Sequence, residues 1–307
     1  MLNRTDRKAG RHRGARSEEP AAPGAENASS GYPGPRKRAR RFLRPSIQLA
    51  LLTAVVVGGV IVVTPADGST GNIAGSFVRA VKQLGFSSRA ASSVTGTPAI
   101  GALFTSSGGK LGSHFCTASV INSPHGDLAI TAAHCVTGTS GTIVFAPDYH
   151  NGVSPFGTWT VTKVYTDQAW QSSQNPNDDF AFLQLSKSGS STPVEDVTGA
   201  EQLATGTPAA GQTVDVIGYP DSSNTPISCQ NALKERMPNQ LEFDCGGYTN
   251  GTSGGPFLTN VSSSTGQGTL IGLIGGYEQG GNTPQVSYSA VLGPNAAALY
   301  RTAVAGG

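Results

Sequence analysis

The sequence predicts an all-β body, about residues 96–307, made of short strands that form barrels or sandwiches. Only 13% of the 307 residues are charged and 41 are Gly, a composition typical of strands joined by many tight turns. Short apolar runs bounded by Gly, Pro, Asn and Asp recur along the body without helical spacers. The predicted strands are 99–104, 116–121, 128–131, 141–145, 180–185, 213–218, 268–274 and 285–290, and a helix is predicted over 295–304.

The first 45 residues are predicted to be a disordered basic tail. Residues 1–44 hold 12 of the 21 Lys and Arg residues and 4 of the 19 acidic residues, and they lack apolar periodicity. Residues 45–307 carry the remaining 9 basic and 15 acidic residues, a net charge of −6. The positive charge therefore belongs to the tail, and the body is not expected to bind nucleic acid.

Residues 46–64 are predicted to be a transmembrane signal anchor. The uncharged stretch 47–63 would span about 25 Å as a helix, near the lower limit for a bilayer. The basic run 36–41 before it predicts a cytoplasmic N-terminus with the body outside the cell membrane. The alternative is a signal peptide that is cleaved to release a secreted protein, although Thr64-Pro65-Ala66 is a poor cleavage site. Residues 65–95 form a predicted linker, with one possible helix over 73–84.

Three short motifs in the body together predict a catalytic site. They are Thr-Ala-Ala-His-Cys around His134, Asp-Asp-Phe-Ala-Phe-Leu around Asp179 and Gly-Thr-Ser-Gly-Gly-Pro around Ser253. A serine hydroxyl needs a base to take its proton, and an imidazole is the natural base near neutral pH. A carboxylate then holds the imidazole in one tautomer. The small residues around Ser253 permit a tight turn that aims backbone N–H groups at one point.

With these residues in the order His, Asp, Ser, the chain resembles the trypsin/chymotrypsin-like serine peptidases, of a bacterial membrane-anchored or secreted type. The resemblance implies two six-stranded antiparallel β-barrels, about 97–195 and 205–300, with the active site in the cleft between them and a short C-terminal helix. It implies a serine endopeptidase that forms an acyl-enzyme at Ser253, with the Gly251 and Ser253 N–H groups as the oxyanion hole. Asp179 is preferred to Asp178 because the family's acid directly precedes the apolar run, and Asp178 is expected to cap a turn. No cofactor and no metal are expected.

The resemblance also assigns a substrate pocket. Gly275, Gly276 and Tyr277 would line it, with Gly247 near its base and Val286 on a wall. The end of the strand that leads to Tyr277 would pair with the substrate backbone. Since no carboxylate stands at the base, the expected preference is for small or medium apolar residues.

The four cysteines allow three pairings. The resemblance implies a disulfide between Cys116 and Cys135, which ties the histidine loop, and Cys229 and Cys245 then pair. Both bridges suit an oxidising compartment.

Other functions fit the sequence less well. An α/β-hydrolase places its acid and then its His after the serine. Here no His follows His150, and Glu278 is the only acidic residue after Ser253. The sequence has no His-Glu-x-x-His or Cys-x-x-Cys motif for zinc. An inactive peptidase-like binding protein and an esterase that uses the same three residues remain alternatives. The expected partner is a peptide or protein substrate, and the protein is expected to be monomeric.

One position departs from the family pattern. Many relatives carry Asp before the catalytic serine, and an N-terminus freed by cleavage upstream pairs with it to form the oxyanion hole. Here that residue is Thr252, although Ile100-Gly101 resembles the segment that is cleaved. Because an ammonium buried without a carboxylate is costly, the oxyanion hole is predicted to form without a new N-terminus.

Overall fold

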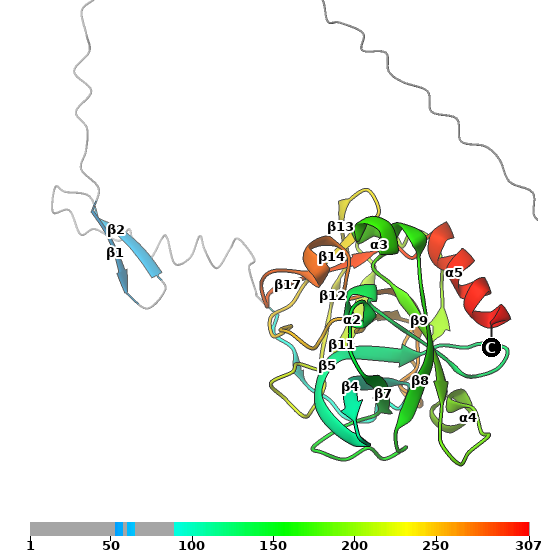
Figure 1. Ribbon diagram of the computed structural model, residues 1–307. Coiled ribbons are helices and arrows are strands. Elements are labelled where there is room, and N and C mark those ends of the chain that lie inside the picture. The colour runs from blue at the N-terminus through cyan, green and yellow to red at the C-terminus, as the bar shows by residue number, and fades with distance from the viewer. Residues whose placement is uncertain (1–52, 58–59, 65–88, 307) are drawn as a thin grey trace, which may run out of the picture. The chain divides into compact units, whose positions relative to one another are not determined.

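The computed structural model describes residues 53–57, 60–64 and 89–306 (Figure 1). The chain divides into two units, Met1–Gly75 and Ser76–Gly307. The predicted basic tail and the possible helix over 73–84 lie outside the described residues, as does most of the predicted linker.

The described part of the first unit is a β-hairpin. Strands β1 (Thr53–Val57) and β2 (Val60–Thr64) pair antiparallel, where the sequence predicts a membrane-spanning helix. Both strands are rich in β-branched residues and Gly58-Gly59 separates them in the sequence, which explains the preference for strand over helix. Within the described ranges, no helix is long and apolar enough to cross a membrane.

The first half of the second unit is a closed six-stranded barrel with the strand order β4-β5-β6-β9-β8-β7. Its largest fully buried side chains include Phe145, Trp159 and Phe182. The strands are β4 (Ile100–Ser107), β5 (Lys110–Val120), β6 (Leu128–Thr131), β7 (Thr142–Pro147), β8 (Trp159–Thr166) and β9 (Ala181–Ser186). This barrel confirms the all-β prediction for the first half.

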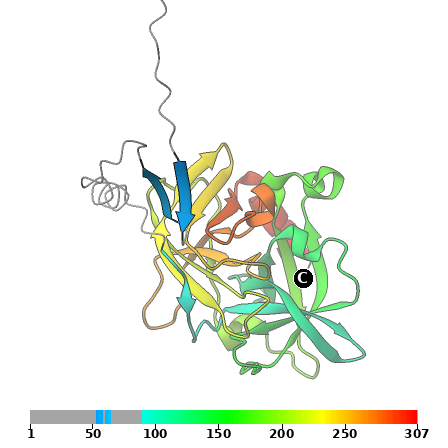
Figure 2. The same cartoon turned by 90° about the vertical axis from the view of Figure 1, so that its left-hand side faces the viewer.

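The second half consists of two sheets in place of one closed ring. A six-stranded sheet has the order β10-β16-β15-β11-β12-β3, and a three-stranded sheet has the order β13-β14-β17. Val216, Phe243 and Phe257 belong to the apolar core of this half. In Figure 2 its yellow and orange strands lie beside the cyan and green strands of the barrel. The strands are β3 (Ser92–Ser93), β10 (Gln202–Leu203), β11 (Thr213–Gly218), β12 (Ile227–Ala232), β13 (Lys234–Met237), β14 (Gln240–Asp244), β15 (Pro256–Thr259), β16 (Thr269–Leu273) and β17 (Val286–Ala290).

A C-terminal helix, α5 (Pro294–Ala305), confirms the helix predicted over 295–304. It packs on the barrel through the Tyr300 ring, which lies 5.7 Å from the Phe182 ring in an edge-to-face arrangement. The Tyr300 hydroxyl donates to the Asn122 carbonyl at 2.9 Å. The other helices are short: α2 (Ala133–Val136), α3 (Gln168–Ser173), η1 (Pro176–Asp178), α4 (Val194–Thr198) and η2 (Tyr277–Gly280).

Candidate active site

Strand pairing in the barrel brings His134 and Asp179 together. Strands β6 and β9 are antiparallel, and Thr131 at the end of β6 is opposite Ala181 at the start of β9. His134 follows β6 on the short helix α2, and Asp179 directly follows η1, two residues before β9. The two side chains therefore leave the same end of one strand pair.

The Asp179 carboxylate holds the His134 imidazole. Its Oδ2 lies 2.8 Å from Nδ1 of the ring, and its Oδ1 accepts the backbone N–H of His134 at 2.9 Å. The N–H of Gly276 donates to Oδ2 at 2.8 Å. Asp179 is 0% exposed, whereas the His134 side chain is 13% exposed. The acid is thus shielded from water and the imidazole reaches the surface of a cavity.

The neighbouring Asp178 serves another part of the molecule. Its Oδ1 accepts from Asn295 Nδ2 at 2.7 Å, and its Oδ2 accepts from Asn175 Nδ2 at 2.7 Å. The pKa of this carboxyl is raised, because burial outweighs the bond from Asn295, which lowers the pKa, and the charge of Asp167 adds to the rise. Asp178 therefore fastens helix α5 to the loop that carries Asp179, and it does not contact the imidazole.

Ser253 and His134 line one cavity of about 860 Å³. The wall contains Tyr248, whose hydroxyl donates to the Val216 carbonyl at 2.6 Å and so fixes the ring. The other lining residues are Phe115, Cys116, Cys135, Thr139, Asp221, Ser222, Thr249, Asn250, Gly251, Thr252, Ile274, Glu278, Gln279, Gly280, Gly281, Asn282, Thr283, Pro284 and Ser287. Asp221 and Glu278 are its two carboxylates, and no Lys or Arg is among the lining residues.

The glycines beside Ser253 are required by close backbone approach. Gly251 has φ 91°, and a Cβ there would lie 2.4 Å from the backbone nitrogen of Asp221. Gly254 has φ 82°, and a Cβ there would lie 2.1 Å from the Thr117 carbonyl oxygen. A side chain at either position would clash with backbone that cannot move aside, which explains the motif physically.

Gly251 and Ser253 have backbone N–H groups that fit an anion site. Both residues line the cavity. Among the hydrogen bonds of the described residues, neither N–H is a donor to a protein acceptor. Free N–H groups beside a serine hydroxyl are suited to stabilise negative charge that develops on a carbonyl oxygen.

Thr117 on β5 ties the Ser253 loop to the barrel, and it is not among the residues predicted from the sequence. Its N–H donates to the Ser253 carbonyl at 2.7 Å, and its hydroxyl donates to the Gly251 carbonyl at 3.0 Å. Its carbonyl accepts from the Thr131 hydroxyl at 2.7 Å. Its place directly after Cys116 is the one sequence feature that could have pointed to it.

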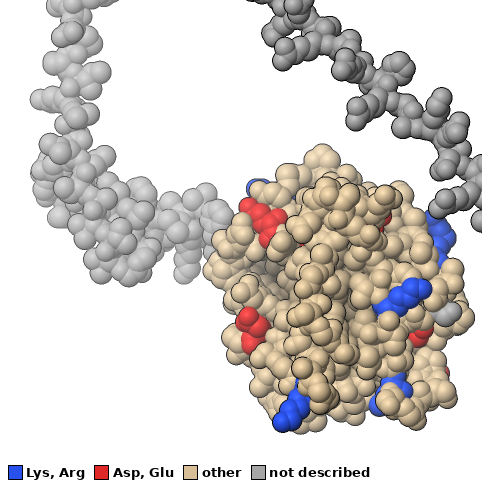
Figure 3. All heavy atoms as spheres, in the orientation of Figure 1, with Lys and Arg blue, Asp and Glu red and all other residues tan. Residues whose placement is uncertain are grey.

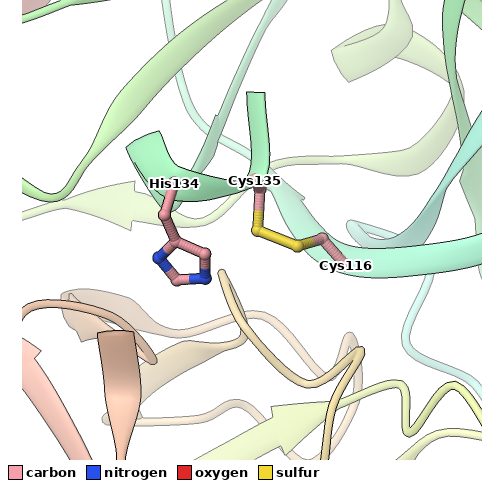
Figure 4. A group of neighbouring side chains, drawn as sticks. All are labelled: Cys116, His134 and Cys135. Atoms are coloured by element: carbon pink, nitrogen blue, oxygen red, sulfur yellow. A yellow bond between two sulfur atoms is a disulfide. The ribbon is translucent and has the colours of Figure 1, made fainter. Parts of the chain in front are cut away.

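Both disulfides pair as predicted, the first where the family resemblance implies it and the second between the two cysteines that remain. Cys116 bonds to Cys135 and Cys229 bonds to Cys245, with Cα separations of 6.2 and 6.6 Å. Figure 4 shows the first bridge beside the His134 ring. His134, Cys116 and Cys135 are close enough to resemble a metal-ligand group, but the two sulfurs are bonded to each other and offer no thiolate.

None of the five residues predicted for the substrate pocket is among the lining residues of this cavity. The prediction required an extended strand up to Tyr277, but β16 ends at Leu273. The chain then turns into η2, where Glu278 and Gln279 have φ of 51° and 54°.

Each of these five residues has another place in the structure. Gly276 N–H donates to the Asp179 carboxylate, and Gly275 N–H donates to the Tyr288 carbonyl at 2.9 Å. Tyr277 lies with its ring 5.2 Å from the Tyr288 ring. Gly247 and Val286 stand outside the cavity wall: Gly247 N–H donates to the Pro284 carbonyl at 2.9 Å, and Val286 pairs with Asp244 across β17 and β14.

Gln240 connects the turn around Tyr277 to the loop that carries Asp179. Its Nε2 donates to the Pro176 carbonyl at 3.1 Å, and its Oε1 accepts the Tyr277 N–H at 2.9 Å. The side chain is buried, so both ends of the amide are satisfied within the protein. Nothing in the sequence distinguishes this glutamine from others.

His134 lies on the first half of this unit and Ser253 on the second, and both line one cavity. The family model described as Trypsin matches residues 86–291, and the chain belongs to this family. Charged side chains are sparse on the face shown in Figure 3, where Lys and Arg do not gather into a patch.

Solved structures agree with this assignment. The protease Anisep from Arthrobacter nicotinovorans has 26% sequence identity and a TM-score of 0.59, over 69% of this chain and 98% of that one. The thermostable serine protease AL20 from an extremophilic microorganism has 26% identity and a TM-score of 0.58, over 69% and 99%. A Glu endopeptidase at 16% identity and a TM-score of 0.57, over 71% and 98%, shares the fold. The search of curated proteins found no match.

Proposed function

We propose that the chain is a serine endopeptidase that cleaves peptide bonds through Ser253, His134 and Asp179. The observation that carries the proposal is the bond between the His134 ring and a fully buried carboxylate, on the same cavity as Ser253. The buried carboxylate keeps the proton on Nδ1, which leaves Nε2 free to act as a base.

The proposed reaction has two halves. His134 Nε2 takes the proton from Ser253 Oγ as Oγ bonds to the substrate carbonyl carbon, and the carbonyl oxygen becomes an oxyanion held by the N–H groups of Gly251 and Ser253. When this intermediate collapses, the C–N bond breaks and the amine leaves with the proton from Nε2. Water then repeats the attack on the acyl-enzyme, which releases the acid and restores the serine.

The substrate proposal is a peptide or protein with a small or medium apolar residue before the scissile bond. The large apolar residues of the cavity wall, Phe115, Tyr248 and Ile274, support this preference. Cleavage of a mixed peptide library, read by mass spectrometry, tests it. A dominant preference for Glu, Lys or Arg at that position would contradict it.

Covalent labelling with a fluorophosphonate tests the mechanism itself. The wild-type protein should be labelled on Ser253, and Ser253→Ala should not be labelled at all. A folded wild-type protein that is not labelled would support the alternative of an inactive binding protein. Turnover of an ester without turnover of any peptide would support the esterase alternative.

We also propose that the body works outside the cytosol and that residues 47–63 attach it to the cell membrane. The two disulfides support an oxidising compartment. Carbonate extraction of membranes separates the attached form from a form secreted after cleavage. Recovery of the body in the soluble fraction, with an N-terminus after residue 64, would favour secretion.

A further inference from the structure

The proposed oxyanion hole depends on two peptide groups whose orientation must be fixed. The Gly251 N–H shares a planar peptide with the Asn250 carbonyl, and the Ser253 N–H shares one with the Thr252 carbonyl. In a trans peptide the N–H and C=O point in opposite directions, so a bond that holds the carbonyl also sets the direction of the N–H.

The two carbonyls are held by different parts of the chain. Thr252 O accepts the Gly255 N–H at 2.9 Å, a contact within the Ser253 loop itself. Asn250 O accepts the Asp221 N–H at 2.8 Å, a contact with a loop about thirty residues earlier in the sequence. The Gly251 donor therefore depends on a residue outside its own motif.

Asp221 occupies a defined turn. The Ser223 N–H donates to the Pro220 carbonyl at 2.9 Å, which makes Asp221 the second residue of a four-residue turn. The Asp221 backbone nitrogen lies directly against Gly251, since a Cβ on Gly251 would come within 2.4 Å of it. The contact is thus tight as well as hydrogen-bonded.

The barrel holds this turn from the other side. His114 Nε2 lies 3.0 Å from the Ser223 carbonyl and donates to it, and the Tyr219 N–H donates to the Thr117 hydroxyl at 2.9 Å. The His114 ring is buried against Phe104, with 5.6 Å between ring centroids. These contacts connect β5 to the loop and, through Asp221, to the oxyanion hole.

Because residue 252 is a threonine, the hydrogen bonds that connect β5 to the oxyanion hole through Asp221 are important. Thr252 stands where a carboxylate would pair with an N-terminal ammonium, but its buried hydroxyl donates to the Thr249 carbonyl at 2.7 Å. Among the salt bridges of the described residues, none involves the Ser253 loop. Neutral hydrogen bonds from backbone N–H and hydroxyl groups hold the loop.

We infer that the backbone N–H of Asp221 is the positioning group that keeps the Gly251 N–H directed at the substrate oxyanion, with His114 holding the Asp221 turn against the barrel. This inference rests on the proposed function. It explains how the site is assembled without a charge pair beside the serine.

The test compares Asp221→Pro with Asp221→Ala. Proline is favoured at the second position of a turn but has no N–H, and its Cδ takes the place of the hydrogen that faces the Asn250 carbonyl, so the bond is lost and the Asn250–Gly251 peptide is displaced. Alanine keeps the N–H and removes the carboxylate. The kcat of Asp221→Pro should fall about 10- to 100-fold below that of Asp221→Ala, with KM changed by less than about threefold. Binding of a peptide aldehyde, whose adduct places an oxyanion in the site, should weaken by the same factor, while binding of the matching peptide acid should not. Equal kcat and equal aldehyde binding in two folded variants would overturn the inference.

A second variant covers the case in which Asp221→Pro does not fold. His114→Phe removes the bond to the Ser223 carbonyl and keeps an aromatic ring, so kcat and aldehyde affinity should both fall by about tenfold or more. Tyr149→Phe, which removes only the contact to Asn224 in the same loop, is the matched control. A His114→Phe protein with the kcat of this control would overturn the inference. If the wild-type protein shows no turnover that Ser253→Ala abolishes, the proposed function itself fails. If the wild-type protein is active and the variants do not differ, only this inference fails.

Discussion

The replacement of Asp179 by Asn tests the central contact of the site. The carboxylate accepts three hydrogen bonds, from the backbone and ring N–H groups of His134 and from the N–H of Gly276. An amide cannot accept all three, because one of its two ends is a donor. If that end faces the ring it favours the wrong tautomer of His134, and if it faces the His134 backbone it leaves two donors in contact.

Either orientation also removes the negative charge that stabilises the imidazolium in the transition state. We expect kcat to fall by about 10⁴, which corresponds to about 5 kcal/mol in the activation free energy. Because the carboxylate is 0% exposed, water cannot replace the lost contacts. The assay is steady-state hydrolysis of a peptide substrate, with KM measured separately.

Asp178→Asn is the matched control for this experiment. Its carboxylate accepts from Asn175 and Asn295, so the change should lower the free energy of unfolding by about 1–3 kcal/mol and leave kcat within about threefold. Urea unfolding and the same kinetic assay measure both effects. If Asp178→Asn abolished turnover and Asp179→Asn did not, the acid would be assigned to the wrong residue.

Three further predictions concern stability and the upstream segment. Burial raises the pKa of Glu201 from 4.5 to about 7, against the opposing bond from Gly268, so its protonated form favours the folded state. The free energy of unfolding should therefore fall by up to about 3 kcal/mol as the pH rises from 4.5 to 7 and then level off; urea titrations of Glu201→Gln should lack this part of the slope. Replacing Cys116 and Cys135 together by Ala should cost about 3 kcal/mol, measured by the same titrations, and equal stability would refute the disulfide's role. A soluble form that begins near residue 69 should be active with an intact start, and trimming it to residue 95 should lower its melting temperature; activity only after trimming to within a residue or two of 100 would reveal a zymogen switch.

Local motifs were sufficient to predict much of the fold, and the structure places His134 in contact with Asp179 and on the same cavity as Ser253. Every strand predicted from the sequence overlaps an observed one, because those strands carry apolar runs that are buried. Several strands were not predicted, among them β8 and β12, which are only partly buried and mix polar with apolar residues, and β15, which is buried but only four residues long.

The cavity wall could not be predicted for a different reason. It depends on the turn after β16, where Glu278 and Gln279 adopt left-handed backbone conformations that these residue types rarely favour. Tertiary contacts impose this turn, including the bond from the Tyr277 N–H to Gln240, a residue about forty positions earlier. Local sequence carries no signal for a contact of that kind.

The environment of Ile100 argues that cleavage there is not needed to build the site. Ile100 is buried in β4, and its N–H donates to the Thr97 carbonyl at 2.9 Å within a turn that begins the barrel. Upstream of that turn, the Ala91 N–H donates to the Gly246 carbonyl at 2.8 Å, and Ser93 pairs with Ile227 on β12. Cutting the chain before Ile100 would break the turn and free an edge strand that covers the segment leading to Ser253. Since Thr252 offers no carboxylate to a new ammonium, the cut would remove stabilising contacts and form no ion pair in return. The fold therefore favours an oxyanion hole that is complete as soon as the chain folds, with residues 89–94 kept in place.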